Sequence, residues 1–237
     1  MSATDQPATP QLTSFNQDHA TVYDERFAKL APFRDALHLL SAAALQPLPE
    51  NARVLCVGAG TGAELLALAA RFPGWHFTAV EPSGPMLDRC RSKAEAAGVS
   101  DRCDFHEGYL ETLPEGEPYH AATSFLVSQF VMDVDKRRDF FRGIRNRLVS
   151  GGHLLTADLS ADRTEETYHE LFETWLRLME HTGLPPEAIA QLRTVYGRDV
   201  AITPPDELEA LIVSAGFATP GPFLQTGLIR AWSTTRI

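Results

Sequence analysis

Three glycines spaced two residues apart, Gly58, Gly60 and Gly62, are the residues whose type and spacing point most directly to chemistry. A glycine carries no side chain, so the backbone N–H groups of such a turn can approach a polar ligand closely. Glu81 follows about twenty residues after the turn, at the spacing where a carboxylate accepts hydrogen bonds from ribose hydroxyls. The pattern predicts a site for a nucleotide-derived cofactor.

The glycine turn must be positioned by a strand before it and a helix after it. The apolar run 54–57 is typical of a buried strand in a parallel sheet, and apolar residues recur at helical spacing over 65–69. Thr61 and Glu64 match a capping box, which predicts that the helix starts at about Gly62. This arrangement brings a helix N-terminus against the ligand.

The rest of the chain continues the alternation of strands and helices that is typical of a doubly wound α/β sheet. Further strands are expected at 76–80, 103–105, 121–127 and 153–157, and an antiparallel C-terminal hairpin is expected from 217–224 and 228–232. The predicted fold is a mainly parallel, Rossmann-like, seven-stranded sheet with helices expected near 83–98, 135–148 and 205–212.

Two helical regions flank the predicted sheet in sequence. Residues 14–48 have helical spacing and form the expected N-terminal helical cap, whereas residues 160–200 form an expected helical lid inserted after the fifth strand. We expect residues 1–13, which are rich in Ser, Thr, Ala and Pro, to be disordered, and residues 14–237 to form a single domain.

Composition narrows the classes of function. The 237 residues carry a formal net charge of −10, which argues against nucleic acid as a partner, and we interpret the basic helix 136–147 as a solvated face. Three widely spaced cysteines predict a reducing, cytoplasmic location, and the histidines show no metal-binding spacing. No apolar run is long enough to predict a membrane span.

The glycines alone leave two cofactor classes open, because Gly58 to Ala63 also fits the dinucleotide pattern G-x-G-x-x-G/A. The long helical stretch before the first strand and the closing hairpin favour a cofactor other than a dinucleotide. Several spaced motifs carry a resemblance to a known family. These motifs are 54–62, 80–83, 86–87, 105–108, 148–152, 205–211 and 215–217. From about Tyr23 to its end, the chain resembles the class I S-adenosylmethionine-dependent methyltransferases.

The resemblance implies a set of cofactor-binding residues. Glu81 would accept hydrogen bonds from the ribose 2′- and 3′-hydroxyls, and Met86 would pack against the adenine. The implied S-adenosyl-L-methionine contacts are Gly58, Ala59, Gly60, Gly62, Glu81, Pro82, Met86, Gly108, Tyr109, Leu110, Phe125 and Leu126. The family commonly has Asp where this chain has Tyr109, so we expect either the backbone there or the stacked tyrosine ring to recognise the adenine.

The resemblance also places an acceptor pocket beyond the fourth and fifth strands. The candidate acceptor-binding residues are His19, Tyr23, Phe27, Gln129, Asp158, Trp175 and Tyr196. We expect in-line methyl transfer to a small molecule without an obligatory general base, so the sequence designates no catalytic residue, no accepting atom and no oligomeric state.

Two other classes of function stay open at this point: an NAD-dependent oxidoreductase, and a catalytically inactive cofactor-binding module. In addition, Phe130, Asp133 and the basic helix after them resemble bacterial enzymes that build a carboxymethyl-bearing cofactor for transfer-RNA wobble uridine.

Overall fold

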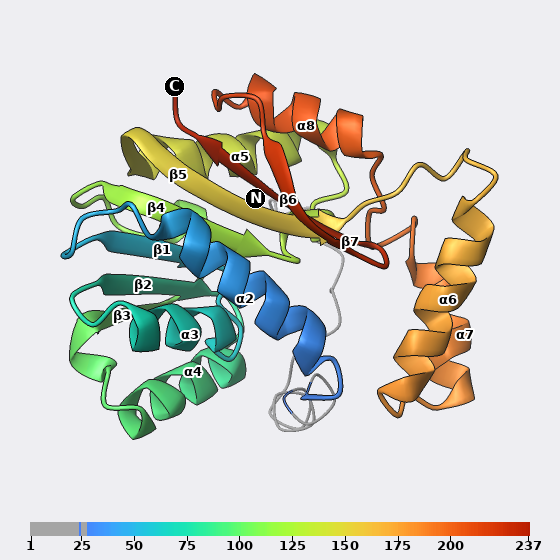
Figure 1. The fold of residues 1–237 in the computed structure, drawn as a ribbon, viewed down its shortest axis with the longest axis horizontal. Coiled ribbons are helices and arrows are strands. Elements are labelled where there is room, and N and C mark those ends of the chain that lie inside the picture. The colour runs from blue at the N-terminus through green and yellow to red at the C-terminus, as the bar shows by residue number, and fades with distance from the viewer. Residues whose placement is uncertain (1–23, 25–27) are drawn as a thin grey trace, which may run out of the picture.

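The protein contains a seven-stranded sheet with strand order β3-β2-β1-β4-β5-β7-β6, seen in a computed structural model that describes Asp24 and residues 28–237 (Figure 1). The strands are β1 (Arg53–Val57), β2 (His76–Glu81), β3 (Cys103–Glu107), β4 (Tyr119–Phe125), β5 (Leu148–Leu159), β6 (Gly221–Thr226) and β7 (Ile229–Thr235). Strands β1 to β5 pair in parallel, and β7 pairs antiparallel with both β5 and β6. The predicted doubly wound sheet with a C-terminal hairpin is therefore confirmed.

Helices cover both faces of this sheet. On one face, α2 (Ala31–Leu45), α3 (Ala63–Arg71) and α4 (Gly84–Ala96) contribute to one buried apolar cluster with β1 and β2. On the other face, α5 (Val134–Arg147) and α8 (Pro205–Ser214) pack with Trp232 and Phe217 in a second cluster. The apolar run of β1 is explained by this arrangement, because its side chains alternate between the two clusters.

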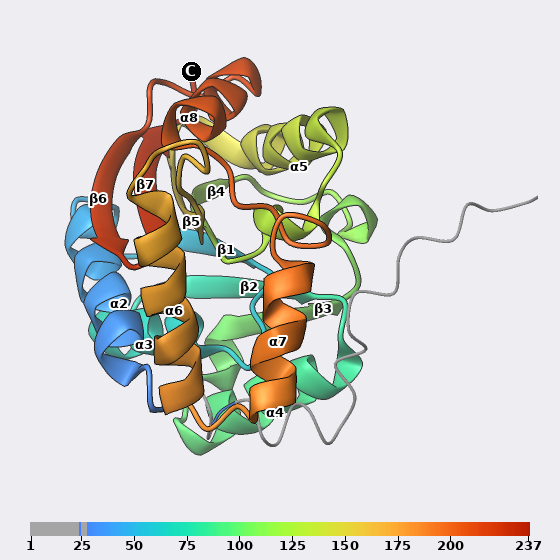
Figure 2. The same cartoon turned by 90° about the vertical axis from the view of Figure 1, so that its right-hand side faces the viewer.

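The insertion after β5 consists of α6 (Tyr168–His181) and α7 (Pro186–Val195). The two helices pack side by side beyond the carboxyl ends of β4 and β5, as Figures 1 and 2 show. Their apolar side chains form a third cluster that also contains Leu30 and Leu228. A helical insertion at this position was predicted, and the cluster supplies the core that a pair of isolated helices would lack.

Several local expectations differ from the structure, including the bounds of β5 (Leu148–Leu159 rather than 153–157) and β6 (Gly221–Thr226 rather than 217–224). Strand β4 ends at Phe125 rather than at 127, because Leu126 adopts a φ of 60°. Helix α6 begins at Tyr168 rather than at 164, because Asp162 accepts hydrogen bonds from the backbone and hydroxyl of Thr164 and forms a local turn.

The predicted capping box also differs from the structure. Helix α3 has no side-chain cap, and its N-cap residue is Gly62 in the left-handed conformation. The hydroxyl of Thr61 instead donates to Asp24 and accepts a hydrogen bond from Lys93 Nζ.

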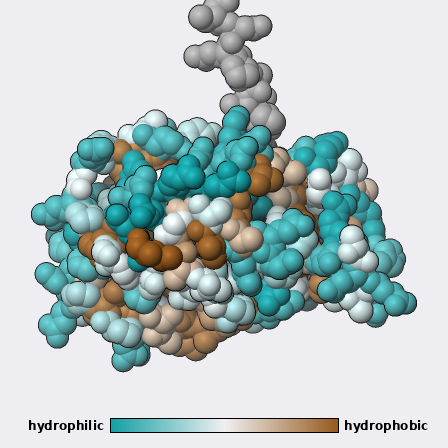
Figure 3. Space-filling view, turned by 90° about the horizontal axis from the view of Figure 1, so that it is seen from above, coloured by the Kyte–Doolittle hydropathy of each residue, from teal (hydrophilic) through white to brown (hydrophobic). Residues whose placement is uncertain are grey.

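One face of the molecule is mostly polar. Seen from above, the face that carries α8 and the C-terminus is largely hydrophilic with separate apolar patches (Figure 3). Within Asp24 and residues 28–237, no helix combines the length and apolar character needed to cross a membrane. The three cysteines are free thiols.

Candidate functional site

The glycine turn between β1 and α3 is held in a conformation that favours glycine. Gly58, Gly60 and Gly62 have φ values of 69°, 55° and 81°. A Cβ atom on Gly58 would overlap the side chain of Val127, and one on Gly62 would overlap the Cys90 sulfur. The turn thus combines left-handed backbone with close packing, and both features exclude larger residues.

Glu81 joins this turn to the two loops beside it. Its Oε2 atom accepts a hydrogen bond from Gly60 N at 2.9 Å, and its Oε1 atom accepts one from Ser83 N at 2.9 Å. The backbone carbonyl of Glu81 accepts from Gly108 N at 3.1 Å. Burial raises the pKa of Glu81, and the hydrogen bonds from Ser83 and Gly60 partly offset this rise. Each carboxylate oxygen keeps further lone-pair capacity for hydroxyl donors.

The predicted adenine side of the site is formed by α4 and the loop after β3. Met86 is buried, and its terminal methyl lies 3.7 Å from the position a Cβ atom would take on Gly60. Tyr109 is 63% exposed, so its ring is accessible for stacking. Leu110 is buried against the helix α5 cluster, which leaves only its backbone near the loop surface.

The carboxyl end of β4 carries an unusual backbone conformation. Leu126 has the one positive φ among the described non-glycine residues. Its N–H donates to the carbonyl of Ala157 at 2.6 Å, which ties the end of β4 to β5. The chain turns sharply here, and Val127 is brought against Gly58. Leucine in this conformation costs about 1–2 kcal/mol, so the surrounding structure must impose it.

Asp158 lies at the end of β5 with no exposed surface. Its carboxylate accepts hydrogen bonds from Ser128 Oγ at 2.8 Å and from Gln129 N at 2.9 Å, and it forms an ion pair with Arg137 at 3.5 Å. Burial raises the pKa of Asp158, whereas the Arg137 charge opposes this. The Gln129 side chain accepts from Leu159 N. Both predicted acceptor residues thus serve the connection between β4 and β5 in this conformation.

The aromatic residues of the insertion contact one another. Trp175 Nε1 donates to the Tyr196 hydroxyl at 3.2 Å, and the Phe172 and Tyr196 rings meet edge to face at 5.9 Å. A Cβ atom on Gly227 would lie 2.8 Å from the Trp175 ring, so the β6–β7 turn packs directly on it. Trp175 and Tyr196 therefore contribute to the core of the insertion.

The remaining predicted acceptor residues, His19, Tyr23 and Phe27, lie outside the described residues. Two other functional candidates were missed by the sequence reading. Asp24 bonds to Thr61 in the glycine turn, and Glu64 in the first turn of α3 is buried. Helical periodicity predicts which face of α3 is buried, so the burial of Glu64 could have been predicted from the sequence. Nothing in the sequence spacing indicates that Asp24 contacts Thr61.

Glu64 adds a second buried carboxylate beside the turn. Burial raises its pKa to about 7; a hydrogen bond from its own backbone lowers it, and the nearby Glu81 charge raises it. The two carboxylates differ in their donors, because Glu81 receives backbone N–H groups from two other residues.

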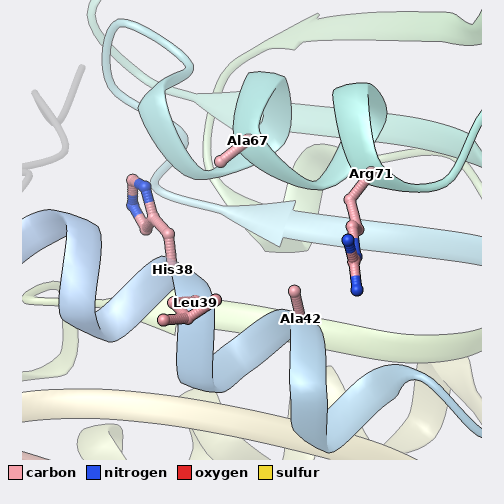
Figure 4. A pocket seen from close by; sticks show the side chains of 5 residues that line it. All are labelled: His38, Leu39, Ala42, Ala67 and Arg71. Carbon is pink, nitrogen blue, oxygen red and sulfur yellow. The ribbon is translucent and has the colours of Figure 1, made fainter.

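A separate hollow of about 220 Å³ lies between α2 and α3, lined by His38, Leu39, Ala42, Ala67 and Arg71 (Figure 4). Burial lowers the pKa of His38 to about 4, with a further lowering by Arg34. The hollow is smaller than most small-molecule pockets, and His38 and Arg71 are the titratable residues that line it.

The geometry fits an adenosine-containing cofactor. The turn offers backbone close to the ligand position without intervening Cβ atoms, and Glu81 offers carboxylate oxygens suited to a neutral diol. Met86 and Tyr109 supply an apolar and an aromatic surface on the adjacent elements.

Comparisons with known proteins agree with this geometry. A family model described as a methyltransferase domain matches residues 54–152. The carboxy-S-adenosyl-L-methionine synthase of Desulfotalea psychrophila is 24% identical over 222 residues, which cover 92% of this chain and 90% of that protein.

Two solved structures share the fold. Mitomycin 7-O-methyltransferase superposes with a TM-score of 0.67 at 18% identity, covering 96% of this chain and 60% of that chain. An O-methyltransferase family 2 protein from Planctomyces limnophilus, solved in complex with apigenin, gives 0.63 at 17% identity, with coverages of 96% and 63%. The chain thus spans about three-fifths of the length of these structural neighbours.

Proposed function

The chain belongs to the class I S-adenosylmethionine-dependent methyltransferases, and from this premise we propose that it methylates a small-molecule acceptor at the carboxyl edge of its sheet. The observation that carries this proposal is the glycine turn braced by Glu81, in which Gly60 N lies 2.9 Å from the carboxylate. S-adenosylmethionine supplies an already activated methyl group when bound, so positioning and exclusion of water account for much of the catalysis.

We assign the holding of the cofactor to three groups of residues. The backbone of Gly58, Ala59 and Gly60 faces its methionine and ribose portions, and Glu81 accepts hydrogen bonds from its ribose hydroxyls. Met86 and the exposed Tyr109 ring flank the adenine. The remaining predicted contacts, Gly62, Pro82, Gly108, Leu110, Phe125 and Leu126, complete the surrounding wall.

We place the acceptor between the ends of β4 and β5 and the insertion α6–α7. Leu126 and Phe130 are partly buried against the insertion cluster, so the edge of the sheet is continuous with it. Apolar surroundings of this kind suit a small molecule better than a polymer. The net charge of −10 also opposes nucleic-acid binding, and we propose a cytoplasmic location and a single domain over residues 14–237.

The first test is calorimetry with the purified protein. We expect saturable binding of S-adenosylhomocysteine and no binding of NAD. Saturable NAD binding without a response to S-adenosylhomocysteine would overturn the proposal in favour of an oxidoreductase. Binding of S-adenosylhomocysteine together with neither a methylated metabolite nor a modified cofactor in a screen with labelled cofactor would instead favour the inactive binding module.

The same assay tests the ribose assignment. Glu81→Ala should weaken S-adenosylhomocysteine binding at least about tenfold, because charge-assisted hydrogen bonds to the diol and the brace on Gly60 are both lost. Glu117→Ala is the matched control, since this exposed carboxylate precedes β4 at the opposite edge of the sheet. Unchanged affinity in Glu81→Ala would mean that the ribose is held elsewhere.

A second candidate function is the formation of a carboxylated cofactor. The relative from Desulfotalea psychrophila is named for that product and matches along nearly its whole length, with 90% of it covered. Incubation with S-adenosylmethionine and a metabolite extract, followed by mass spectrometry, distinguishes the two candidates. S-adenosylmethionine carrying an added carboxyl group favours this second function, whereas a methylated metabolite with S-adenosylhomocysteine favours the first.

A further inference from the structure

Asp24 is clamped between the glycine turn and helix α4. Its Oδ1 atom accepts a hydrogen bond from the Thr61 hydroxyl at 2.7 Å. Its Oδ2 atom forms ion pairs with Lys93 Nζ at 2.7 Å and with Arg89 Nη2 at 3.1 Å. Lys93 also donates to Thr61 Oγ1 at 3.0 Å, which closes the cluster.

The cluster holds the one residue of the turn that has a functional side chain. Thr61 lies between Gly60 and Gly62, which both adopt left-handed conformations. Glycines are conformationally free, so a turn that contains them needs external contacts to stay in one conformation. Asp24 supplies such a contact, and Glu81 supplies another through Gly60 N.

The chain close to Asp24 also contacts the insertion. Leu30 is buried in the cluster that contains Trp175 and Leu176. A Cβ atom on Gly183, in the loop between α6 and α7, would lie 3.1 Å from the Lys29 ammonium nitrogen. Asp24 thus contacts the glycine turn, and residues 29–30 contact the insertion on the acceptor side.

We propose that Asp24 is a positioning residue for the cofactor, which holds the glycine turn through Thr61 and slows cofactor release. This inference rests on the proposed function, because the ligand whose release Asp24 slows is the cofactor assigned to the glycine turn there. The partners are partly buried, with side-chain exposures of 26% for Asp24 and 34% for Lys93, so solvent screens their charges less than at an open surface.

The test measures the dissociation rate of S-adenosylhomocysteine by stopped-flow competition. Asp24→Asn keeps the shape of the side chain but removes its charge, and we expect release to become about tenfold faster. Added salt should accelerate release from the wild type more than from Asp24→Asn, since only the wild type has the ion pairs to screen. A residue that merely stabilised the fold would not produce this difference.

Two further comparisons separate the clamp from a general loss of stability. Thr61→Val should release S-adenosylhomocysteine faster, whereas Thr61→Ser, which keeps the hydroxyl, should behave as the wild type. Asp88→Asn is the matched control, because it removes an exposed ion pair with Arg91 on the same helix. Its dissociation rate should not change.

The outcomes distinguish the two proposals. A wild type that does not bind S-adenosylhomocysteine overturns the proposed function, and the clamp with it. A wild type that binds, combined with unchanged dissociation rates in Asp24→Asn and Thr61→Val, overturns the clamp alone.

Discussion

At the scale of single residues, burial raises the pKa of two carboxylates beside one turn, and the two differ in their hydrogen-bond donors. Glu81 accepts backbone N–H groups from Gly60 and Ser83, which favour its charged form. Glu64 is buried and receives a hydrogen bond from its own backbone, and its pKa rises to about 7. The turn therefore lies beside one carboxylate that holds backbone N–H groups and another whose pKa is raised to about 7.

Glu64 should make the stability of the protein depend on pH. Because its folded-state pKa of about 7 exceeds the ordinary value of 4.5, its contribution is fully present below 4.5 and is lost as the pH rises through 7. Glutamine at position 64 does not ionise, so Glu64→Gln lacks this loss of stability. The melting temperature of the variant minus that of the wild type should therefore be several degrees larger at about pH 8 than at about pH 5.

Differential scanning calorimetry at both pH values provides the measurement, with the exposed Glu117→Gln as the control. A difference between Glu64→Gln and the wild type that is the same at both pH values would contradict the assignment.

At the scale of elements, the β1–α3 turn depends both on backbone conformation and on close approach. Gly58 and Gly98 have similar φ values, 69° and 68°, but differ in their surroundings. A Cβ atom on Gly58 would overlap Val127, whereas one on Gly98 would have no neighbour within 4 Å. Alanine substitutions at these two glycines therefore separate the free-energy cost of the backbone conformation from that of the steric overlap.

Gly98→Ala should lower the free energy of unfolding by about 1–2 kcal/mol, because alanine is strained at this φ. Gly58→Ala should lower it by more, since the added methyl also displaces Val127, which follows β4. Urea denaturation measures both values. Equal losses in the two variants would show that close approach at Gly58 carries no cost of its own.

At the scale of the whole molecule, Arg137 of α5 connects segments that are far apart in sequence. Its guanidinium donates to Ser128 Oγ and to Thr203 Oγ1, each at 2.8 Å, and pairs with Asp158. Thr203 belongs to the segment that returns from the insertion, and its N–H donates to Leu159. Arg137 thereby ties α5 to the connection after β4, to the end of β5 and to the segment that returns from the insertion.

Arg137→Met should destabilise the protein by about 3–5 kcal/mol, because it leaves Asp158 buried without its positive partner. Arg138→Met provides the control. Arg138 pairs with the exposed Asp135 at 2.7 Å, and loss of such a pair should cost less than about 1 kcal/mol. Chemical denaturation of both variants checks the prediction, and a similar small loss in each would contradict it.

The strands of the sheet, its C-terminal hairpin and the glycine turn could be predicted because they depend on local patterns. The run 54–57, the glycine spacing and the position of Glu81 are readable in the sequence, and a parallel sheet brings the ends of β1 and β2 together. Helix and strand ends were less accurate, as at Leu126, because one tertiary hydrogen bond to Ala157 stops β4 there.

The sequence by itself therefore determined the fold class and the glycine turn, since side-chain periodicity and glycine conformation act over a few residues. Only the tertiary structure decided that Asp158 is paired inside the molecule, and that Trp175 packs within the insertion. It also decided that Asp24 reaches Thr61, 37 positions away in the chain. Such contacts depend on how separate elements pack together, and a polar residue in a sequence does not indicate which distant partner will neutralise it.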